Sequence, residues 1–173
     1  MDNLMGRCVL SVIVLLGAAT DLRKHKIPNW LTLPAMVLGL VINGLGGLGF
    51  QTALFGMLVA IGIYFLFFAI GFRGAGDGKL MGAVGAFIGW PHIVSVIVLV
   101  ALLAGAAAIV LSWQRGLLGN VLRSTASLVA DIVCFRWRAV KQRSDFRAPG
   151  SLRLPHGPVI AVGTLVFLLF SPR

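Results

Sequence analysis

Long uncharged stretches alternate with short basic segments along the chain, a pattern typical of a protein that crosses a membrane several times. About 20 consecutive apolar residues are enough to cross a bilayer as one helix. Residues 80–114 carry no charge, but one helix of that length would extend about 52 Å, so we expect a turn at Trp90-Pro91-His92. The pattern predicts six helices, at about 4–20, 30–48, 52–72, 77–90, 93–112 and 154–170.

The composition agrees with this pattern. Hydrophobic residues make up 58% of the chain and charged residues 12%, whereas a soluble domain has about 25% charged residues. A chain of 173 residues cannot bury so much apolar surface in one core, so much of its exterior must face lipid. We therefore expect an all-α, polytopic membrane protein made of one domain, 1–173, in which the loop 113–153 is an insertion.

The distribution of basic residues predicts the orientation of the chain. The loops after the first, third and fifth helices contain Lys and Arg, whereas the second and fourth loops contain neither. Basic loops remain in the cytoplasm, so we expect these three loops on the cytoplasmic side of a bacterial inner membrane and both termini outside. The net charge of +10 then reflects contact with anionic lipid headgroups, and we expect no nucleic-acid partner.

Two segments permit more than one interpretation. The first apolar run ends in small residues at 17–19 and resembles a cleaved signal peptide, but the basic cluster at 23–26 argues against translocation of the following loop. In the fifth loop, apolar residues recur at helical spacing over 117–135, which predicts an amphipathic helix in the cytoplasmic headgroup region. A seventh crossing is the alternative, but it would carry Arg123 and Asp131 through the bilayer at a cost of several kcal/mol.

The chain contains five Asp and no Glu, so each carboxylate is informative. Asp21 ends the first helix, and Asp77 lies among glycines in 74–79 at the start of the fourth. Each has a structural explanation, in which Arg23 or Lys24 neutralises Asp21 and Asp77 caps the fourth helix. The expected topology, however, brings both to one membrane face, where two carboxylates that share one proton can activate a water for hydrolysis.

Glycines also mark the fourth helix. Gly78, Gly82, Gly85 and Gly89 are spaced four, three and four residues apart, so they line one face of that helix. A face without side chains lets a neighbouring backbone approach closely. We expect this face to let the helices of the two aspartates pack together.

Two proline-containing segments precede helices: Ile-Pro-Asn at 27–29 precedes the second, and Leu-Pro-His-Gly-Pro at 154–158 precedes the sixth. The simplest structural explanation is that both segments begin helices, and that Asn29 caps the N-terminus of the second helix. His156 has the chemistry of a base, although a lone histidine is more often a hydrogen-bonded structural residue. Lys79 either favours a nearby ionised carboxylate or extends to the membrane surface.

The cysteines give no sign of a metal site. Cys8 and Cys134 are far apart and form no CxxC motif, which argues against a zinc site and a disulfide framework. Both are expected to be buried as small apolar residues, and we expect neither a metal nor a cofactor.

In their order along the chain, Asp21, 27–29, 74–80 and 154–158 resemble the type IV prepilin peptidases, a family of intramembrane-type aspartyl proteases with a G-x-G-D motif. The resemblance covers nearly the whole chain. It implies cleavage of the short basic leader from prepilins or pseudopilins at the cytoplasmic face, with Asp21 and Asp77 as the catalytic aspartates. The other residues expected to shape the site or hold extended substrate are Asn29, Gly74, Gly76, Gly78, Lys79, Pro155, Gly157 and Pro158.

The chain departs from the long members of that family, which carry a cytoplasmic insertion with paired cysteines and methylate the new N-terminus. Its first loop is short and it has no CxxC motif, so it is similar to the short peptidases of tight-adherence (Flp) pilus systems. We therefore expect cleavage without methylation.

Two other functions are compatible with the motifs. Presenilin-like proteases share the G-x-G-D motif at 74–77, but their Pro-Ala-Leu motif is absent here. A small transporter or pilus-assembly subunit would use Asp21 and Asp77 as proton or cation sites. Such a protein needs charges near the middle of the membrane, and none of the five acids is expected there.

Overall fold

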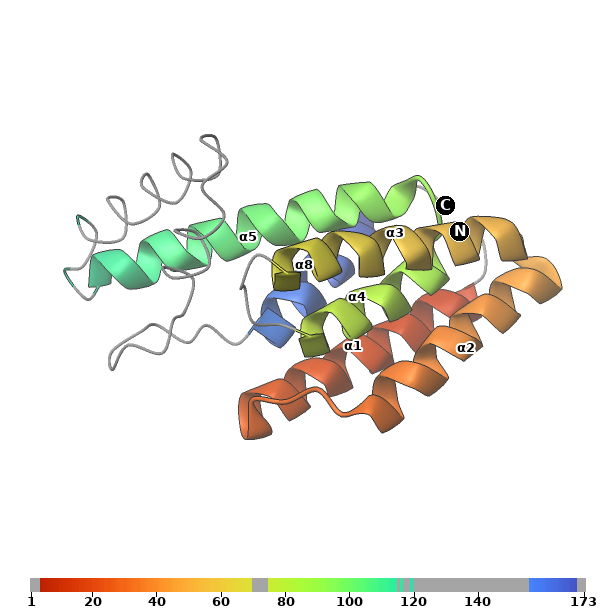
Figure 1. Ribbon diagram of the computed structural model, residues 1–173, viewed down its shortest axis with the longest axis horizontal. Coiled ribbons are helices and arrows are strands. Elements are labelled where there is room, and N and C mark those ends of the chain that lie inside the picture. The colour runs from red at the N-terminus through yellow and green to blue at the C-terminus, as the bar shows by residue number, and fades with distance from the viewer. Residues whose placement is uncertain (1–3, 70–74, 115, 117–118, 120–155, 171–173) are drawn as a thin grey trace.

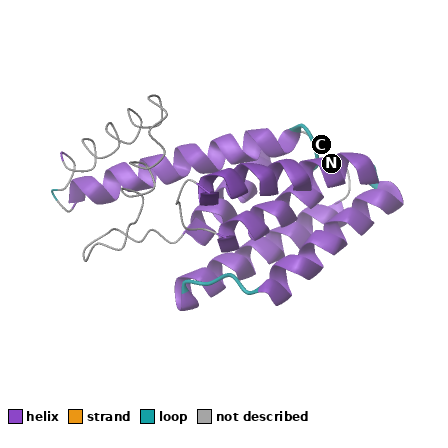
Figure 2. Ribbon diagram, viewed as in Figure 1, coloured by secondary structure: helices purple, strands orange, loops and turns teal. Residues whose placement is uncertain are grey.

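The computed structural model describes residues 4–69, 75–114, 116, 119 and 156–170. Within these residues the chain forms six helices and no strand (Figures 1 and 2). The helices are α1 (Leu4–Lys24), α2 (Asn29–Gly46), α3 (Phe50–Ala69), α4 (Ala75–Ile88), α5 (His92–Gln114) and α8 (His156–Phe170). The expected all-α fold is confirmed, as is the turn between the fourth and fifth helices. The interfacial helix expected at 117–135 lies outside the described residues, apart from Gly119.

The helices differ in how much of their surface is buried. Four of them, α1, α2, α3 and α5, are long and apolar enough to cross a membrane, and α8 is a shorter apolar helix. The 14-residue α4 lies inside the bundle, where it packs against all five other described helices and buries every residue from Leu80 to Gly89. The outer helices expose large apolar side chains, such as Phe65 (64%) and Leu102 (66%), that suit contact with lipid. The protein is therefore a polytopic membrane protein built around one short helix.

The glycine face of α4 packs against α3. An ideal Cβ on Gly85 would lie 2.5 Å from the carbonyl oxygen of Gly56, so the two backbones are in contact there. The ideal Cβ of Gly78 would lie 3.1 Å from the Cβ of Tyr64. The close approach expected from the glycine spacing is confirmed, but the partner is α3 and not the helix of Asp21. Helix α1 instead reaches α4 through Gly17, whose ideal Cβ would lie 3.1 Å from the side chain of Leu80.

This packing predicts a loss of stability on adding one methyl group. Gly85→Ala is expected to lower the free energy of unfolding by about 1–3 kcal/mol, because the backbones of α3 and α4 must separate to admit it. Gly62→Ala is the matched control, since nothing lies within 4 Å of the ideal Cβ of Gly62 on the outer side of α3. Unfolding titrations in mixed detergent micelles measure the difference. Equal stability of the two variants would contradict the backbone contact.

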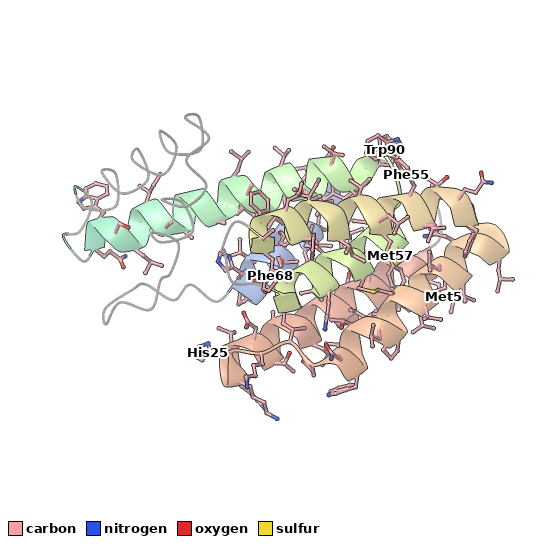
Figure 3. All side chains as sticks on the ribbon, in the orientation of Figure 1. Met5, His25, Phe55, Met57, Phe68 and Trp90 are labelled. Atoms are coloured by element: carbon pink, nitrogen blue, oxygen red, sulfur yellow. The ribbon has the colours of Figure 1, made fainter. Side chains whose placement is uncertain are left out.

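Consecutive helices run in opposite directions (Figure 1). The last turns of α1, α3 and α5 and the first turns of α2, α4 and α8 therefore lie at one end of the bundle, which we call the aspartate end. In Figure 3 the labelled His25 and Phe68 lie at this end, and Trp90 lies at the other. At the opposite end, Arg7 donates a hydrogen bond to the carbonyl of Leu168, which joins α1 to the last turn of α8.

A hydrogen-bonded side chain holds the C-terminus of α4, away from the aspartate end. The side-chain amide of the buried Asn43 donates hydrogen bonds to the carbonyls of Ala86 (2.8 Å) and Phe87 (3.0 Å). The last carbonyls of a helix have no partner within the helix, and Asn43 supplies one. Because α4 is one continuous helix of 14 residues, this contact at its end also helps to set the position of its first turn, where Asp77 lies.

Candidate active site at the aspartate end

Asp21 lies in the last turn of α1 and is buried, with 8% of its surface exposed. Its Oδ2 accepts a hydrogen bond of 2.8 Å from the backbone N–H of Gly157, the second residue of α8. The first N–H groups of a helix have no partner within the helix, and the helix dipole there favours a negative charge. The carboxylate, unfavourably placed at the C-terminus of its own helix, is thus stabilised by the N-terminus of another.

The structural explanation in which Arg23 or Lys24 neutralises Asp21 does not hold. Arg23 and Lys24 are both exposed, and among the described residues neither forms an ion pair with Asp21. The helix instead closes at His25, which has a positive φ of 49° and donates its N–H to the carbonyl of Asp21 at 2.8 Å. The backbone and the side chain of Asp21 are therefore each held by one hydrogen bond.

Asp77 lies inside the first turn of α4 and is partly buried. The structural explanation in which it caps this helix is wrong, because α4 begins two residues earlier, at Ala75. Glycines on both sides admit neighbouring segments: the ideal Cβ of Gly76 would lie 3.4 Å from Ile27, and that of Gly78 would touch Tyr64. Gly74 lies outside the described residues.

The two aspartates interact electrostatically. The carboxylates of Asp21 and Asp77 lie close enough to repel each other. The charge of Asp21 also acts on His156 at the start of α8, and that of Asp77 acts on Tyr64 of α3. Four helices thus contribute to a polar cluster at one end of an otherwise apolar bundle. The first-helix and fourth-helix carboxylates thus lie at the same end of the bundle and interact electrostatically.

Tyr64 is the member of this cluster that sequence reasoning missed. It is the only tyrosine of the chain and interrupts an apolar helix, which was the available signal. Buried tyrosine hydroxyls usually have a polar neighbour. Tyr64 is partly buried and the charge of Asp77 acts on its hydroxyl, which only the packing of α3 on α4 reveals.

Lys79 and Asn29 form a link across the aspartate end. Lys79 Nζ donates a hydrogen bond of 2.8 Å to Asn29 Oδ1, which joins α4 to the start of α2. Asn29 was expected to cap α2, and this is wrong, because Pro28 occupies the capping position and makes no side-chain hydrogen bond there. The Lys79 amine is therefore engaged with an amide oxygen at the exposed rim of the site.

The structure describes only some of the remaining expected residues. Gly157 is buried against Asp21, and Pro158 follows it in the first turn of α8, where proline is tolerated. Pro155 lies outside the described residues. Cys8 is exposed, so the expectation that it is buried is wrong, and Cys134 lies outside the described residues.

The protein is thus a multi-pass helical membrane protein with two carboxylates at one end of its bundle. Comparison with known sequences identifies its family. The profile of the type IV leader peptidase family matches residues 8–110, which include both aspartates, and the chain belongs to this family. Two relatives, each called prepilin leader peptidase/N-methyltransferase, come from Burkholderia pseudomallei strains 1026b and K96243. Each is 28% identical over 170 residues, covering 94% of this chain and 45% of the relative. The chain thus spans less than half of their length, and no solved structure matches it.

Proposed function

We propose that this protein is a membrane-embedded aspartyl endopeptidase that removes the basic leader of prepilins or pseudopilins. The observation that carries the proposal is that Asp21 and Asp77, from separate helices, lie at one end of the bundle close enough for their charges to repel each other. Membership of the type IV leader peptidase family and the names of the two relatives support the same reaction.

The reaction needs one ionised and one protonated carboxyl group. The ionised group takes a proton from a water molecule, whose oxygen forms a bond to the scissile carbonyl carbon. The protonated group gives its proton to the leaving amine as the carbon–nitrogen bond breaks. Asn29, Gly76, Gly78, Lys79, Gly157 and Pro158 shape this end of the bundle, and Gly74 and Pro155 complete the set by sequence.

Hydrolysis accounts for the arrangement better than transport does. A transporter needs polar groups along a path through the bilayer. The two carboxylates instead lie at the same end of the bundle, and α4 between the two ends is buried in apolar contacts. The transporter and assembly-subunit alternatives therefore have no specific observation in their favour.

Co-expression with a candidate prepilin, in a host that lacks any other prepilin peptidase, tests the proposed function. The mass of the pilin recovered from the membrane is expected to fall by that of its leader when this protein is present. An unprocessed prepilin beside a folded, membrane-inserted protein, for every Flp-type candidate tried, would contradict it.

We place the site at the cytoplasmic face of a bacterial inner membrane. The support is the group of basic residues beside the aspartate end, Arg23, Lys24 and Lys26, which would face anionic lipid headgroups. Reporter fusions at Gly47 and Lys141, the second of which lies beyond the described residues, are expected to report opposite sides, with Lys141 in the cytoplasm. The same side for both fusions would contradict this topology.

We propose further that the protein serves Flp-type pilins and does not methylate the new N-terminus. Only residues 25–28 join α1 to α2, a loop with no cysteine pair. With this protein as the sole processing enzyme, the mass of the mature pilin N-terminus is expected to equal that of the unmodified amine. An added methyl group, about 14 Da, would contradict the second part of the proposal and leave the first intact.

A further inference from the structure

The hydrogen bond between Gly157 and Asp21 distinguishes the two aspartates. We propose that the N-terminus of α8 holds Asp21 in its ionised form, so that Asp21 is the base that activates water and Asp77 is the acid. Gly157 is then a positioning residue that acts through its backbone N–H. This assignment of roles rests on the proposed peptidase function.

The contact favours a negative charge on Asp21. The N–H of Gly157 can only donate, and it lies 2.8 Å from Oδ2 in a buried position. A hydrogen bond to an ionised carboxylate is roughly twice as strong as one to a neutral carboxyl group. Burial of the carboxylate would otherwise be costly, and the unpaired N–H groups at the start of α8 offset that cost.

Asp77 lies in the first turn of α4, and among the described residues none supplies it with a donor equivalent to Gly157. Within the described residues no hydrogen bond reaches its carboxylate, and the nearby amine of Lys79 is engaged by Asn29. Within the part of the chain that the structure describes, the other titratable groups that interact with the pair are His156 from α8, beside Asp21, and Tyr64 from α3, beside Asp77. Because like charges repel, one proton shared by the pair resides on the carboxyl group that accepts no hydrogen bond from a described residue. That group is Asp77.

Only glycine permits this contact. An ideal Cβ at position 157 would lie 2.7 Å from the Cβ of Asp21 and 2.9 Å from its Oδ2. The helices α1 and α8 are also joined at the opposite end by Arg7 and the carbonyl of Leu168. The helices α1 and α8 are therefore joined at both ends, which keeps the N–H of Gly157 aimed at the carboxylate of Asp21.

An amide-to-ester exchange removes the N–H without changing the shape of the backbone. Glycolic acid is introduced at position 157 by nonsense suppression in cell-free translation, and at position 163 as the control. Gly163 lies inside α8, where the N–H bonds within the helix. The substrate is a prepilin that the unmodified protein cleaves, and kcat/KM is measured against pH.

The ester at 157 is expected to move the acidic limb of the profile by about one to two units to higher pH, because the ionised base loses a charge-assisted hydrogen bond. The ester at 163 is expected to leave both limbs in place. An unmoved acidic limb with the 157 ester, or movement of the basic limb alone, would overturn the assignment. The peptidase function would survive that result provided that Asp21→Asn still abolishes cleavage.

Alanine variants provide a second, independent test that needs no ester. The ideal Cβ of Gly163 would lie 2.6 Å from Val100, so Gly157→Ala and Gly163→Ala crowd the same helix to a similar degree. Gly157→Ala is expected to lower kcat by about 10- to 100-fold with little change in KM, and Gly163→Ala to keep kcat within about twofold. Equal losses in kcat would show that only the packing of α8 matters, which would overturn the proposal.

Discussion

Replacement of Asp21 or Asp77 by Asn is expected to abolish leader cleavage. The expected fall in rate is about 100- to 10,000-fold, the usual contribution of a general acid or base. Asparagine keeps the size of the side chain and still accepts a hydrogen bond, so the N–H of Gly157 retains a partner in Asp21→Asn. What the variant loses is the ability to take up or release a proton. Initial rates with a purified prepilin measure the effect, and expression and membrane insertion are expected to remain unchanged.

Matched controls separate this effect from a general loss of charge. Asp131→Asn and Asp145→Asn remove acids from the basic loop and are expected to cleave at the wild-type rate. The variant with both Asp21→Asn and Asp77→Asn is expected to be no slower than either single variant, because the two groups act as a unit. Two separate, multiplying losses would indicate that the aspartates do not share one step.

The second large effect is expected at Gly78, beside Asp77. Gly78→Leu would place a branched side chain where even a Cβ lies 3.1 Å from the Cβ of Tyr64. Helix α3 and the first turn of α4 must then separate, and any shift of that turn displaces Asp77. A shift of about 1 Å in a catalytic group can reduce the rate about 100-fold, and we expect a loss of this size in cleavage by Gly78→Leu.

Gly62→Leu is the control for Gly78→Leu. It adds the same side chain to the outer side of α3, where nothing lies within 4 Å of the ideal Cβ. This variant is expected to cleave at close to the wild-type rate. If Gly78→Leu also retained full activity while folded, the close packing of α3 at the site would have no role in positioning Asp77.

The helices could be predicted from the sequence because lipid imposes a simple rule. Uncharged runs of sufficient length must be helical, and the six expected runs are the six described helices. The exact first and last residues of the helices differ from the predicted ones. Helix α1 continues through Arg23 to Lys24, since basic residues suit the last turn of a helix, and α4 begins before Asp77 although glycines precede it.

The contents of the site were only partly predictable. Topology alone brings Asp21 and Asp77 to one end of the bundle. Asp21 lies in the last turn of α1 and Asp77 in the first turn of α4, and helices that alternate in direction place these two turns at the same end. The hydrogen bond from Gly157 to Asp21 joins residues 136 positions apart, and it depends on α8 packing beside α1. Helices that are apolar on every side give no sign of which neighbour they contact. The same lack of pattern explains why the exposure of Cys8 was not foreseen.

Cleavage by the purified protein in liposomes, with a synthetic prepilin as the only other polypeptide, tests the central claim most directly. The claim is that Asp21 and Asp77 together hydrolyse the leader peptide bond. We expect the wild-type protein to release the leader, with a bell-shaped dependence of the rate on pH that belongs to the pair, and Asp21→Asn and Asp77→Asn to release none. Release of the leader by either variant at a rate near that of the wild type would contradict the account.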